Sequence, residues 1–599
     1  MGGRRNRPKR PYSFRLGSQT RRLRASFLLV AFVMSIFAGR LIQLQGVDAN
    51  SYATLARDAR MRTVVLPAVR GNIIDTNGVE LATTVDTVAI TADPKQTAPD
   101  AVQIAGILAP RLGLDAAPIT KALQSPGKRF VYIAHQVDQS VWKKIRADLA
   151  TARLAGISSE SDPKRVYPAG SVAANMIGFV GTDVAGLPAG LGGLAGLESS
   201  LNNVLAGKNG QQTYEVSSEG PALPLGDDSL LKPVAGRGVQ LTIDADLQYV
   251  AQKTVADAVK KTGADSGDAI VIDVRTGQIL AMATAPTFDA NKPLATDGKQ
   301  RVDHPVSDNY EPGSVFKLFT AAALLDQGLV TPATKELVPG YLYRGGSRIK
   351  DWWLHGTTDL TFAGSIARSS NIGTILAAEQ MAPETQDSYL RKFGFGQRVD
   401  VGLPDEAAGS LAPGATWSPL TRATISFGQG VAVTALQMAV GVAAIANGGE
   451  RIAPQLIKGY VAADGTVTPA AAPARTQVIS AQASRQLLDI MEQVTKPSAI
   501  APKGAIVGYR TGGKTGTAQK ANSACGCYKN YTVSFAQVAP ADAPRFVAYV
   551  DLQNVGGHAS GGGSAGPVAA EILKAALQKY QVPPSGSVAP NLNITWGKN

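Results

Sequence analysis

The stretch SGDAIVIDVRTGQILAMATAP, Ser266 to Pro286, gives the clearest indication of the fold. Two apolar segments flank the turn residues Arg275 to Gly277, which is the pattern of a β-hairpin. Further strand-like segments occur late in the chain: GKTGTAQK, NYTVSFAQVAP and PRFVAYVDLQ. The Ala-rich region 314–450, which lies between the hairpin and these late segments, has a helical pattern. Strands at both ends with helices between them predict an α+β domain, in which helices pack on one antiparallel sheet.

The segment that precedes this domain has a different pattern. Between residues 46 and 235, short strand-like pieces such as TVVLPA, TVAITA and FVYIA alternate with polar helical pieces. RGNIIDTNGVELATT, Arg70 to Thr84, predicts a hairpin with Asp-Thr-Asn-Gly as its turn. We therefore expect one domain at 46–235 and a second at 236–581. The remainder, 582–599, is rich in Pro, Ser and Asn and is predicted to be a flexible tail.

The N-terminal region has the composition of a membrane anchor. Residues 1–24 carry nine Lys or Arg and no acid, and the apolar run ASFLLVAFVMSIFAG follows directly. Residues 25–45 have about the length that a membrane-spanning helix needs. Because no A-x-A cleavage site follows, we expect an uncleaved anchor rather than a signal peptide. The positive-inside rule predicts that residues 1–24 are cytoplasmic and that the rest of the protein lies outside the membrane.

The charge of the chain does not point to nucleic acid. The formal net charge is +13, but much of the excess lies in the basic N-terminus. Membrane orientation is the favoured explanation for such a segment, so we expect no nucleic-acid partner.

Cysteines and histidines give no sign of a metal site, so neither a metal nor a cofactor is expected. The two cysteines, in CGC, are too few for a four-cysteine zinc site, and a disulfide between them would be geometrically tight. We interpret the pair as a feature of a loop. The histidines are scattered along the chain. The residues concerned are Cys525, Cys527, His135, His304, His355 and His558.

The stretch YEPGSVFKLFT places a serine and a lysine in an unusual setting. A helix is predicted over Val315–Gln327, so Ser314 and Lys317 would share one face. This helix carries no charge except Lys317 as far as Leu325, and a helix that is apolar all round is buried. Burial lowers the pKa of a lysine, which makes Lys317 a base at neutral pH and Ser314 a nucleophile.

The S-x-x-K pattern alone is weak evidence. It occurs six times, and five of the pairs lie in polar helices, in loop-like contexts or around a proline. Only Ser314 combines a tight Pro-Gly entry, an apolar helix and a lysine without a nearby acid. The other five pairs are Ser125/Lys128, Ser140/Lys143, Ser161/Lys164, Ser229/Lys232 and Ser347/Lys350.

Two further motifs complete the set. K-T-G occurs at Lys261, where helix capping explains it, and at Lys514 to Thr517, where it enters a predicted strand. A glycine inside a strand often marks the close approach of a ligand or another backbone. S-x-N occurs at Ser200, at Ser307 and at Ser369 to Asn371. The last of these stands between two apolar helical stretches, where three polar residues need a reason.

With these three motifs in this order, the chain resembles the penicillin-binding proteins and serine β-lactamases. Five other stretches are similar to motifs of the class B penicillin-binding proteins: RGNIIDTNGVELATT, RVYPAGSVAANMIGFVG, GLESSLNNVLAGKNG, LTIDADLQ and SFGQGVAVTALQMA. The resemblance covers roughly residues 25 to 575. It implies an α+β transpeptidase domain on an elongated pedestal domain, with one N-terminal transmembrane helix.

The resemblance also implies an activity, that of a peptidoglycan D,D-transpeptidase which cross-links stem peptides and is inhibited by β-lactams. Ser314 would attack the D-Ala-D-Ala carbonyl, Lys317 would take its proton, and Ser369 would relay protons to the leaving D-Ala. Lys514 would supply positive charge for the terminal carboxylate. The substrate would be bound by Asn371, Thr515, Gly516 and Thr517. The N–H groups of Ser314 and Thr517 would form the oxyanion hole.

Partners and alternatives follow from the same resemblance. The asparagine of SSN and the EPGS context favour the septal, cell-division type, with an elongation-type transpeptidase as the alternative. A glycan-polymerising membrane protein and other division proteins are the expected partners. A β-lactam sensor or a scaffold without turnover would share the motifs. Gly562 to Gly566 also matches the G-x-S-x-G nucleophile elbow, but no histidine follows Ser564, so we reject that interpretation.

Overall fold

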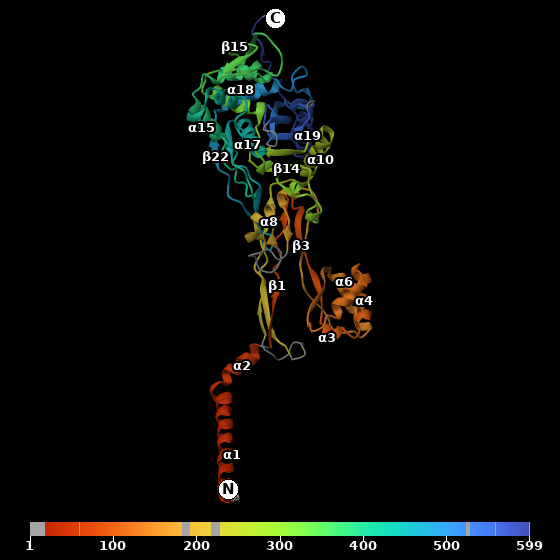
Figure 1. Ribbon diagram of the computed structural model, residues 1–599. Coiled ribbons are helices and arrows are strands. Elements are labelled where there is room, and N and C mark those ends of the chain that lie inside the picture. The colour runs from red at the N-terminus through yellow and green to blue at the C-terminus, as the bar shows by residue number, and fades with distance from the viewer. Residues whose placement is uncertain are drawn as a thin grey trace, which may run out of the picture. The chain divides into compact units, whose positions relative to one another are not determined.

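The computed structural model describes residues 18–58, 60–181, 192–216, 228–522, 527–556 and 559–597 (Figure 1). The chain divides into two compact units. The first consists of Met1–Leu66 and Gly210–Lys232, and the second of Pro67–Asn209 and Pro233–Asn599. The first unit contains the apolar N-terminal helix, and the second contains every residue predicted for the active site.

The first unit combines a long helix with a small sheet. Helix α1 (Gln19–Ile42) begins at Ser18, whose hydroxyl accepts the Arg21 N–H at 3.3 Å. Within the described ranges, Gln19–Val47 is the one helical segment long and apolar enough to cross a membrane, and none of it is buried, in agreement with the predicted anchor. The other elements are η1 (Gln43–Val47), α2 (Ala49–Asp58) and the antiparallel strands β1 (Met61–Leu66), β10 (Gly210–Glu215) and β11 (Asp228–Leu231).

In the second unit, a six-stranded sheet joins residues from both predicted domains. Its strands, in spatial order, are β21 (Val467–Pro469), β20 (Ile457–Val461), β12 (Gly238–Leu241), β2 (Ile73–Ile74), β3 (Glu80–Val85) and β7 (Lys164–Val166). The predicted hairpin is β2–β3, and the Asp75 carboxylate in its turn accepts the N–H groups of Asn77 and Val79 at 2.7 and 2.8 Å. Because β12 pairs with β2 and with β20, the sheet spans the boundary expected at 235/236.

A buried ion cluster lies beside this sheet. Glu198 bonds Arg70 at 2.5 Å through one carboxylate oxygen and Arg165 at 2.7 Å through the other, and all three side chains are almost completely buried. Removing one member of such a cluster leaves an unpaired buried charge, which typically costs about 3–5 kcal/mol. The neighbouring short elements are α7 (Ala174–Ile177), β8 (Val180–Gly181), β9 (Gly192–Gly193), α8 (Gly196–Ser200) and α9 (Asn202–Leu205).

A small α/β subdomain has its own hydrophobic core, which includes Ile90, Leu108 and Ile145. Its central strand is flanked by two antiparallel partners, in the order β5-β4-β6. The elements are β4 (Thr87–Ala92), α3 (Pro94–Thr97), α4 (Ala101–Leu112), α5 (Ala116–Leu123), β5 (Val131–Asp138), α6 (Gln139–Thr151) and β6 (Ile157–Ser161).

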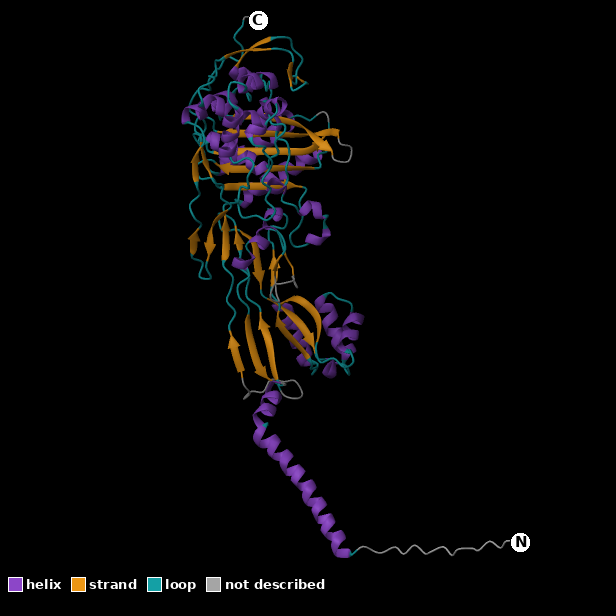
Figure 2. Ribbon diagram, turned by 60° about the vertical axis from the view of Figure 1, so that its left-hand side comes forward, coloured by secondary structure: helices purple, strands orange, loops and turns teal. Residues whose placement is uncertain are grey.

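The predicted α+β domain is built on a five-stranded antiparallel sheet, and Figure 2 shows its strands between helices. The spatial order is β14 (Ile279–Ala285), β13 (Ser266–Asp273), β25 (Phe546–Val555), β24 (Cys527–Ala539) and β23 (Gly512–Asn522). Strands β13 and β14 form the predicted hairpin. Strand β23 carries Lys514 to Thr517 at the edge of the sheet, and no described strand pairs with its outer side.

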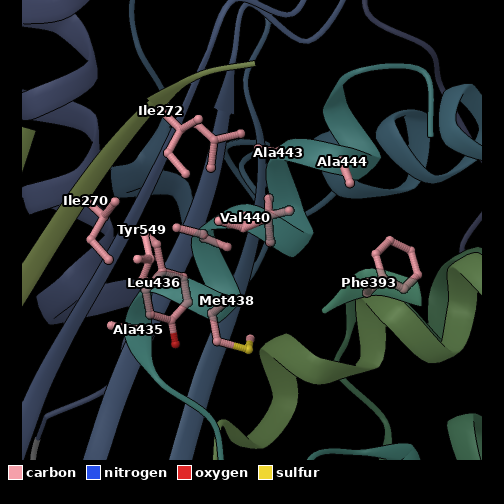
Figure 3. Close-up of a cluster of buried hydrophobic side chains, with 14 of the residues drawn as sticks. Ile270, Ile272, Phe393, Ala435, Leu436, Met438, Val440, Ala443, Ala444 and Tyr549 are labelled. Atoms are coloured by element: carbon pink, nitrogen blue, oxygen red, sulfur yellow. The ribbon is translucent and has the colours of Figure 1, made fainter. Parts of the chain in front are cut away.

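Helices cover both faces of this sheet because residues on each strand alternate between the two sides. Ile270 and Ile272 point toward α17 (Ala435–Ala446), as Figure 3 shows, whereas Ala269 and Val271 belong to the core beneath α10 (Ala245–Thr262) and α19 (Gly566–Lys579). The remaining helices are α11 (His304–Ser307), α12 (Lys317–Asp326), α13 (Phe362–Ala367), α14 (Asn371–Ala378), α15 (Pro383–Phe393), α16 (Pro419–Ser426) and α18 (Ala481–Glu492). The remaining strands are β15 (Lys335–Val338), β16 (Leu342–Arg344), β17 (Ser347–Ile349), β18 (Thr358–Thr361), β19 (Glu450–Ile452) and β22 (Arg475–Gln477).

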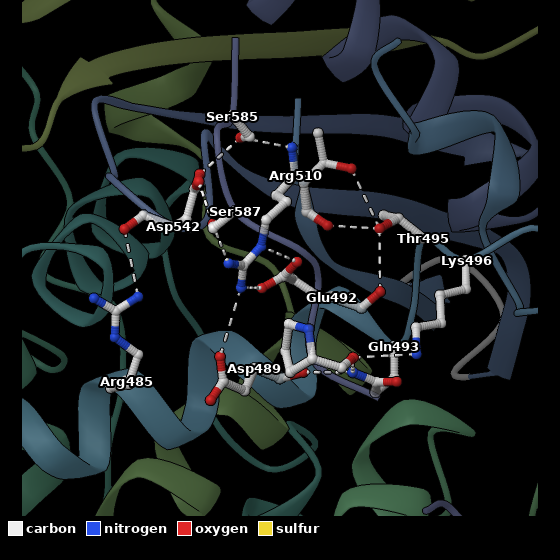
Figure 4. Close-up of polar contacts among 12 residues, drawn as sticks. Arg485, Asp489, Glu492, Gln493, Thr495, Lys496, Arg510, Asp542, Ser585 and Ser587 are labelled. Atoms are coloured by element: carbon white, nitrogen blue, oxygen red, sulfur yellow. Dashed lines mark hydrogen bonds and ion pairs between the residues drawn. The ribbon is translucent and has the colours of Figure 1, made fainter. Parts of the chain in front are cut away.

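The C-terminal segment differs from the expectation of a flexible tail. Residues 582–597 form no helix or strand, but they are held against the domain by hydrogen bonds (Figure 4). Arg510 donates through its backbone N–H to Ser585 Oγ at 2.9 Å and through its guanidinium to Ser587 Oγ at 2.7 Å. Both serine hydroxyls donate to the Asp542 carboxylate at 2.7 Å. The Pro-, Ser- and Asn-rich composition of this segment predicted the irregular backbone but not these contacts.

Farther along, the same segment contacts the start of α13. Thr361, which caps α13, donates its hydroxyl to the Asn593 carbonyl at 2.7 Å and its N–H to the Ile594 carbonyl at 3.2 Å. The Trp596 indole N–H donates to the Glu336 carbonyl at 3.1 Å. The segment therefore braces the helix that leads to Ser369.

Candidate active site

One pocket of the second unit brings together residues from all three predicted motifs. It has a volume of about 380 Å³, and its wall includes Ser314, Ser369, Asn371, Thr515 and Thr517. These residues come from the turn before α12, the junction of α13 and α14, and edge strand β23. Gly516 lies between the two threonines on β23, and Lys317 and Lys514 lie behind the wall, fully buried.

Ser314 lies in a tight turn rather than in an α-helix. Residues Gly313–Phe316 form a 3₁₀ turn, and α12 begins at Lys317. Gly313 has φ +57°, and a Cβ there would lie 3.1 Å from the Ala518 side chain on β23. The sequence predicted a helix from Val315, so it missed the 3₁₀ turn. In such a turn, side chains three residues apart eclipse one another, so we expect Ser314 and Lys317 to share one face.

Lys317 is buried, and no described acidic side chain forms an ion pair with it. Its ammonium donates to the Ser369 carbonyl at 2.7 Å, the Asn371 Oδ1 at 2.8 Å and the Ser369 hydroxyl at 3.3 Å. Burial lowers the pKa of Lys317 to about 7, although the negative charge of Asp351 opposes the shift. A lysine with this pKa is neutral in a large fraction of molecules at neutral pH, as a proton acceptor must be.

Lys514 approaches the same serine from β23. Its ammonium donates to Ser369 Oγ at 2.8 Å and to the carbonyl of Thr515 at 3.0 Å. Burial and the nearby charge of Lys317 hold the pKa of Lys514 well below its usual value. Two buried cations around one hydroxyl repel each other, so each lysine disfavours the charged form of the other.

Ser369 occupies a strained backbone position. Its φ is +61°, in the left-handed region that a serine rarely adopts. Ser370 follows as the N-cap of α14 and accepts the Gly373 N–H at 2.9 Å. Strain of this kind is typical of functional sites, where the surrounding structure holds the residue in place.

Asp351 fixes the start of α14, and no sequence motif pointed to it. Its buried carboxylate accepts the Asn371 N–H at 2.5 Å, the Ile372 N–H at 3.1 Å and the Ser370 hydroxyl at 2.6 Å. His355 contacts the same carboxylate at 3.1 Å. The only local signal was an acid and a histidine four residues apart in DWWLH, which has many ordinary explanations.

Gly516 allows β23 to lie against the serine turn. A Cβ at this position would clash with Ser534 Oγ and would lie 3.1 Å from the Pro312 carbonyl. The backbone of β23 therefore runs directly beside the turn that carries Ser314, which is the close approach that the K-T-G motif predicted.

Among the other candidates from the sequence, Lys261, His135 and His304 do not line this pocket, whereas Gly562 of the rejected nucleophile elbow does. Lys261 lies in the last turn of α10, where Gly263 caps the helix in the left-handed conformation, as expected. His135 and His304 each contact an aspartate, Asp162 and Asp308 respectively. Cys525 and His558 lie outside the described residues. In the part of the chain that is described, no group of three or more His, Cys, Asp or Glu is arranged to hold a metal ion.

Comparison with known proteins agrees with this geometry. Residues 267–574 match the penicillin-binding protein transpeptidase domain, and residues 65–241 match the penicillin-binding protein dimerisation domain. Penicillin-binding protein PbpB of Mycolicibacterium smegmatis is 37% identical, covering 96% of this chain and 92% of that protein. Peptidoglycan D,D-transpeptidase FtsI of Escherichia coli is 30% identical, covering 94% of this chain and 92% of that protein.

A solved structure is similar over most of the chain as well. Penicillin-binding protein 3 of Mycobacterium tuberculosis in complex with aztreonam has a TM-score of 0.68 and 33% identity, covering 89% of this chain and all of that one. The two domain matches occur in one chain with an N-terminal apolar helix, and the serine, its lysine and the K-T-G strand meet at one pocket. This chain belongs to the class B penicillin-binding proteins.

Proposed function

We propose that the protein is a peptidoglycan D,D-transpeptidase of the septal type, which cross-links stem peptides through an acyl-enzyme at Ser314. The observation that carries the proposal is the arrangement of Ser314 at a pocket, one turn from a buried lysine whose pKa is about 7. The similarity to the D,D-transpeptidase FtsI supports the reaction and the septal assignment.

The first half of the reaction makes an ester. Neutral Lys317 takes the proton of Ser314 Oγ while the oxygen attacks the carbonyl carbon between the two D-Ala residues. The resulting oxyanion accepts hydrogen bonds from the backbone N–H groups of Ser314 and Thr517, an arrangement worth about 3–4 kcal/mol per donor elsewhere. As the C–N bond breaks, the leaving D-Ala amine receives a proton through Ser369, which contacts both lysines.

The second half makes the cross-link. The amine of a second stem peptide attacks the ester carbonyl, its proton passes back through the same groups, and Ser314 Oγ leaves and regains its hydrogen. Asn371 is close enough to hold the substrate amide, because its side chain lines the pocket and is fixed by Lys317. Product release restores the free serine.

The terminal carboxylate of the substrate has a role in the charge balance. Thr515 and Thr517 line the pocket on β23, and Lys514 lies behind them. A carboxylate bound at the threonines favours the charged form of Lys514, which is disfavoured in the empty site. Substrate binding is therefore expected to favour protonation of Lys514, whose ammonium then attracts the substrate carboxylate.

The membrane anchor gives this site its location. We propose that residues 1–24 are cytoplasmic, that residues 25–45 span the membrane, and that residues 46–235 are a pedestal for a transpeptidase domain at 236–581. The nine basic residues before the span support this orientation. A glycan-polymerising membrane protein and other division proteins are the proposed partners.

Intact-mass measurement and peptide mapping after incubation with a penicillin test the proposal. We expect one slowly released adduct on Ser314, absent in Ser314→Ala and present in Ser140→Ala, whose serine belongs to another S-x-x-K pair. Turnover is then measured as D-Ala release from a stem-peptide donor in the presence of an amine acceptor. An adduct without D-Ala release would favour a sensor or scaffold, and rapid loss of the adduct would indicate a β-lactamase.

A further inference from the structure

A hairpin beside the pocket presents an exposed aromatic and basic face. Strands β16 and β17 pair antiparallel, and Leu342 and Ile349 pack inward against the hydrophobic cluster of Ile375, Ala423 and Phe427. The alternate side chains point outward. This hairpin face consists of Tyr341, Tyr343, Arg348, Lys350 and Trp352, all of them exposed.

The aromatic rings of the hairpin face are held in place. Tyr341 and Tyr343, which are 51% and 58% exposed, make an edge-to-face contact at 5.7 Å, and the Arg348 guanidinium lies 4.5 Å from the centre of the Tyr341 ring. Trp352 is 68% exposed, yet its indole N–H donates to the Arg368 carbonyl at 2.8 Å. Exposed rings fixed in this way lose little conformational entropy when they bind a ligand.

The hairpin face is continuous with the catalytic pocket. Trp352 forms part of the pocket wall, and the Lys350 carbonyl accepts the Asn371 side-chain amide at 3.0 Å. A ligand that extends out of the pocket past Trp352 therefore meets the rest of this face.

The charge of the hairpin face is positive. Arg348 and Lys350 have no ion pair among the described residues, whereas Arg344, on the inner side of the hairpin, is paired with Glu379 at 2.5 Å. An exposed guanidinium is suited to a carboxylate, which it can bind through two parallel hydrogen bonds.

We propose that the hairpin face binds the peptidoglycan strand whose stem peptide enters the pocket. Sugar rings have apolar C–H faces and polar edges, which match the amphipathic rings of tyrosine and tryptophan. Stem peptides carry carboxylates, which match Arg348 and Lys350. The inference rests on the proposed function, because the ligand is the polymer to which the substrate peptide is attached. Weak contacts here add to binding at the pocket because both act on one molecule.

Co-sedimentation of the full-length, detergent-solubilised protein with purified insoluble peptidoglycan tests the proposal. We expect Tyr341→Ser/Tyr343→Ser/Arg348→Ser to bind the polymer at least about fivefold more weakly, as loss of a binding hot spot would predict. Acylation by a fluorescent penicillin is expected to stay within about twofold, because none of the three residues lines the pocket and a penicillin is too small to reach them. The matched control, Tyr249→Ser/Lys260→Ser on α10, also removes an exposed tyrosine and a cation and is expected to bind normally.

Two further measurements separate the possible outcomes. Arg348→Gln alone keeps the aromatic rings and is expected to weaken polymer binding and reduce its salt dependence. If the triple variant misfolds and loses acylation, this single variant tests whether the hairpin face binds the polymer. Binding to glycan strands without stem peptides measures the sugar contacts alone, because these strands lack the peptide carboxylates. Unchanged polymer binding by both variants would overturn the proposal, and if the variants lost only a co-purifying protein, the face would be a protein-docking surface. Penicillin acylation of the wild type reports on the proposed function independently.

Discussion

Ser369 is the residue at which the two buried lysines meet, and its left-handed backbone places its hydroxyl between them. Neither lysine has a carboxylate within hydrogen-bonding distance among the described residues. The site therefore holds two lysine amines whose pKa values are lowered by burial. None of the described residues that line the pocket is a histidine, so Lys317 is the proposed acceptor of the serine proton.

With Lys317 as the proposed base, its pKa predicts how acylation depends on pH. Since the base must be neutral, the acylation rate is expected to rise about tenfold per pH unit below 7 and to level off above it, with a midpoint near the pKa of about 7. Initial rates with a fluorescent penicillin between pH 5 and 9 measure this profile. Lys317→Arg, which stays protonated, is expected to be inactive across the range. A rate independent of pH between 5 and 8 would rule out Lys317 as the base.

Asp351 is expected to act through the residues that it holds. In Asp351→Asn, one acceptor oxygen becomes an amide N–H₂ group facing the donors of α14, which should destabilise the fold by about 1–3 kcal/mol. Acylation should be slower, and the midpoint of its pH profile should move to lower pH, because the carboxylate raises the pKa of Lys317.

Thermal unfolding and the acylation profile of Asp351→Asn measure these effects. Asp257→Asn on α10, where the carboxylate forms a surface pair with Lys253, is the control and should change neither. A loss of stability without a shift of the midpoint would mean that Asp351 has a purely structural role.

For single residues of the active site, the sequence motifs identified the side chains but not their geometry. Ser314, Lys317, Ser369, Asn371 and Lys514 were named from motifs, and the structure places them around one pocket; their catalytic roles stay predictions. The left-handed φ of Ser369 and the contacts of Asp351 depend on distant parts of the chain. No local pattern encodes them.

The position of edge strand β23 beside the serine turn depends on a glycine, Gly516. Gly516→Ala is expected to push β23 away from the serine turn, because a Cβ has no room between Ser534 and the Pro312 carbonyl. Acylation should fall by at least about tenfold, while a strained Cβ contact should cost about 1–3 kcal/mol of stability. Gly586→Ala, where a Cβ would meet nothing within 4 Å, should behave as wild type. Normal acylation in Gly516→Ala would show that the close approach is not needed.

The C-terminal segment gives a second prediction for an element. Deleting residues 590–599 removes the acceptors of the Thr361 N–H and hydroxyl and the Trp596 contact. We expect a melting temperature lowered by a few degrees, since one buried unsatisfied donor costs about 1–3 kcal/mol, together with slower acylation. A chain shortened only by residues 598–599 is the control. Equal stability and acylation of the two chains would show that these contacts are not needed, as expected for the flexible tail that the sequence predicted.

Elements with strong local signals were predicted well. The hairpins β2–β3 and β13–β14 follow from turn residues between apolar strands, and the structure confirms both. The bracing role of residues 593–596 could not be predicted, because carbonyl acceptors belong to every residue and leave no trace in composition. The predicted start of α12 was wrong, because a 3₁₀ turn and an α-helical turn have similar local sequence patterns.

For the whole molecule, the division into two units predicts what the anchor is needed for. The active-site pocket lies entirely in the second unit. Removing residues 1–45 is therefore expected to release the protein from the membrane while penicillin acylation stays within about twofold, since domains with their own core fold alone. Fractionation of cells and acylation of the purified fragment measure the two effects. A fragment that folds but is not acylated would mean that the anchor shapes the pocket.

The boundary between pedestal and catalytic domain is less sharp than composition suggested. Strand β12 pairs with β2 on one side and β20 on the other, so the six-stranded sheet contains strands from both regions. Sequence patterns indicate where strands lie but not which distant strands pair, because pairing of this kind depends on long-range contacts.

The order of strands in the five-stranded sheet affects how the protein is made. Gly267 on β13 pairs with Leu552 on β25, and the whole helical region is synthesised between them. If the chain crosses the membrane from its N-terminus, the apolar hairpin β13–β14 emerges long before its partner strand and must wait with an unpaired edge. Such non-local pairing is slow and prone to aggregation. Shielding of the early hairpin is therefore expected to help export, and a chain that ends before β25 lacks the strand that joins β13 to β24.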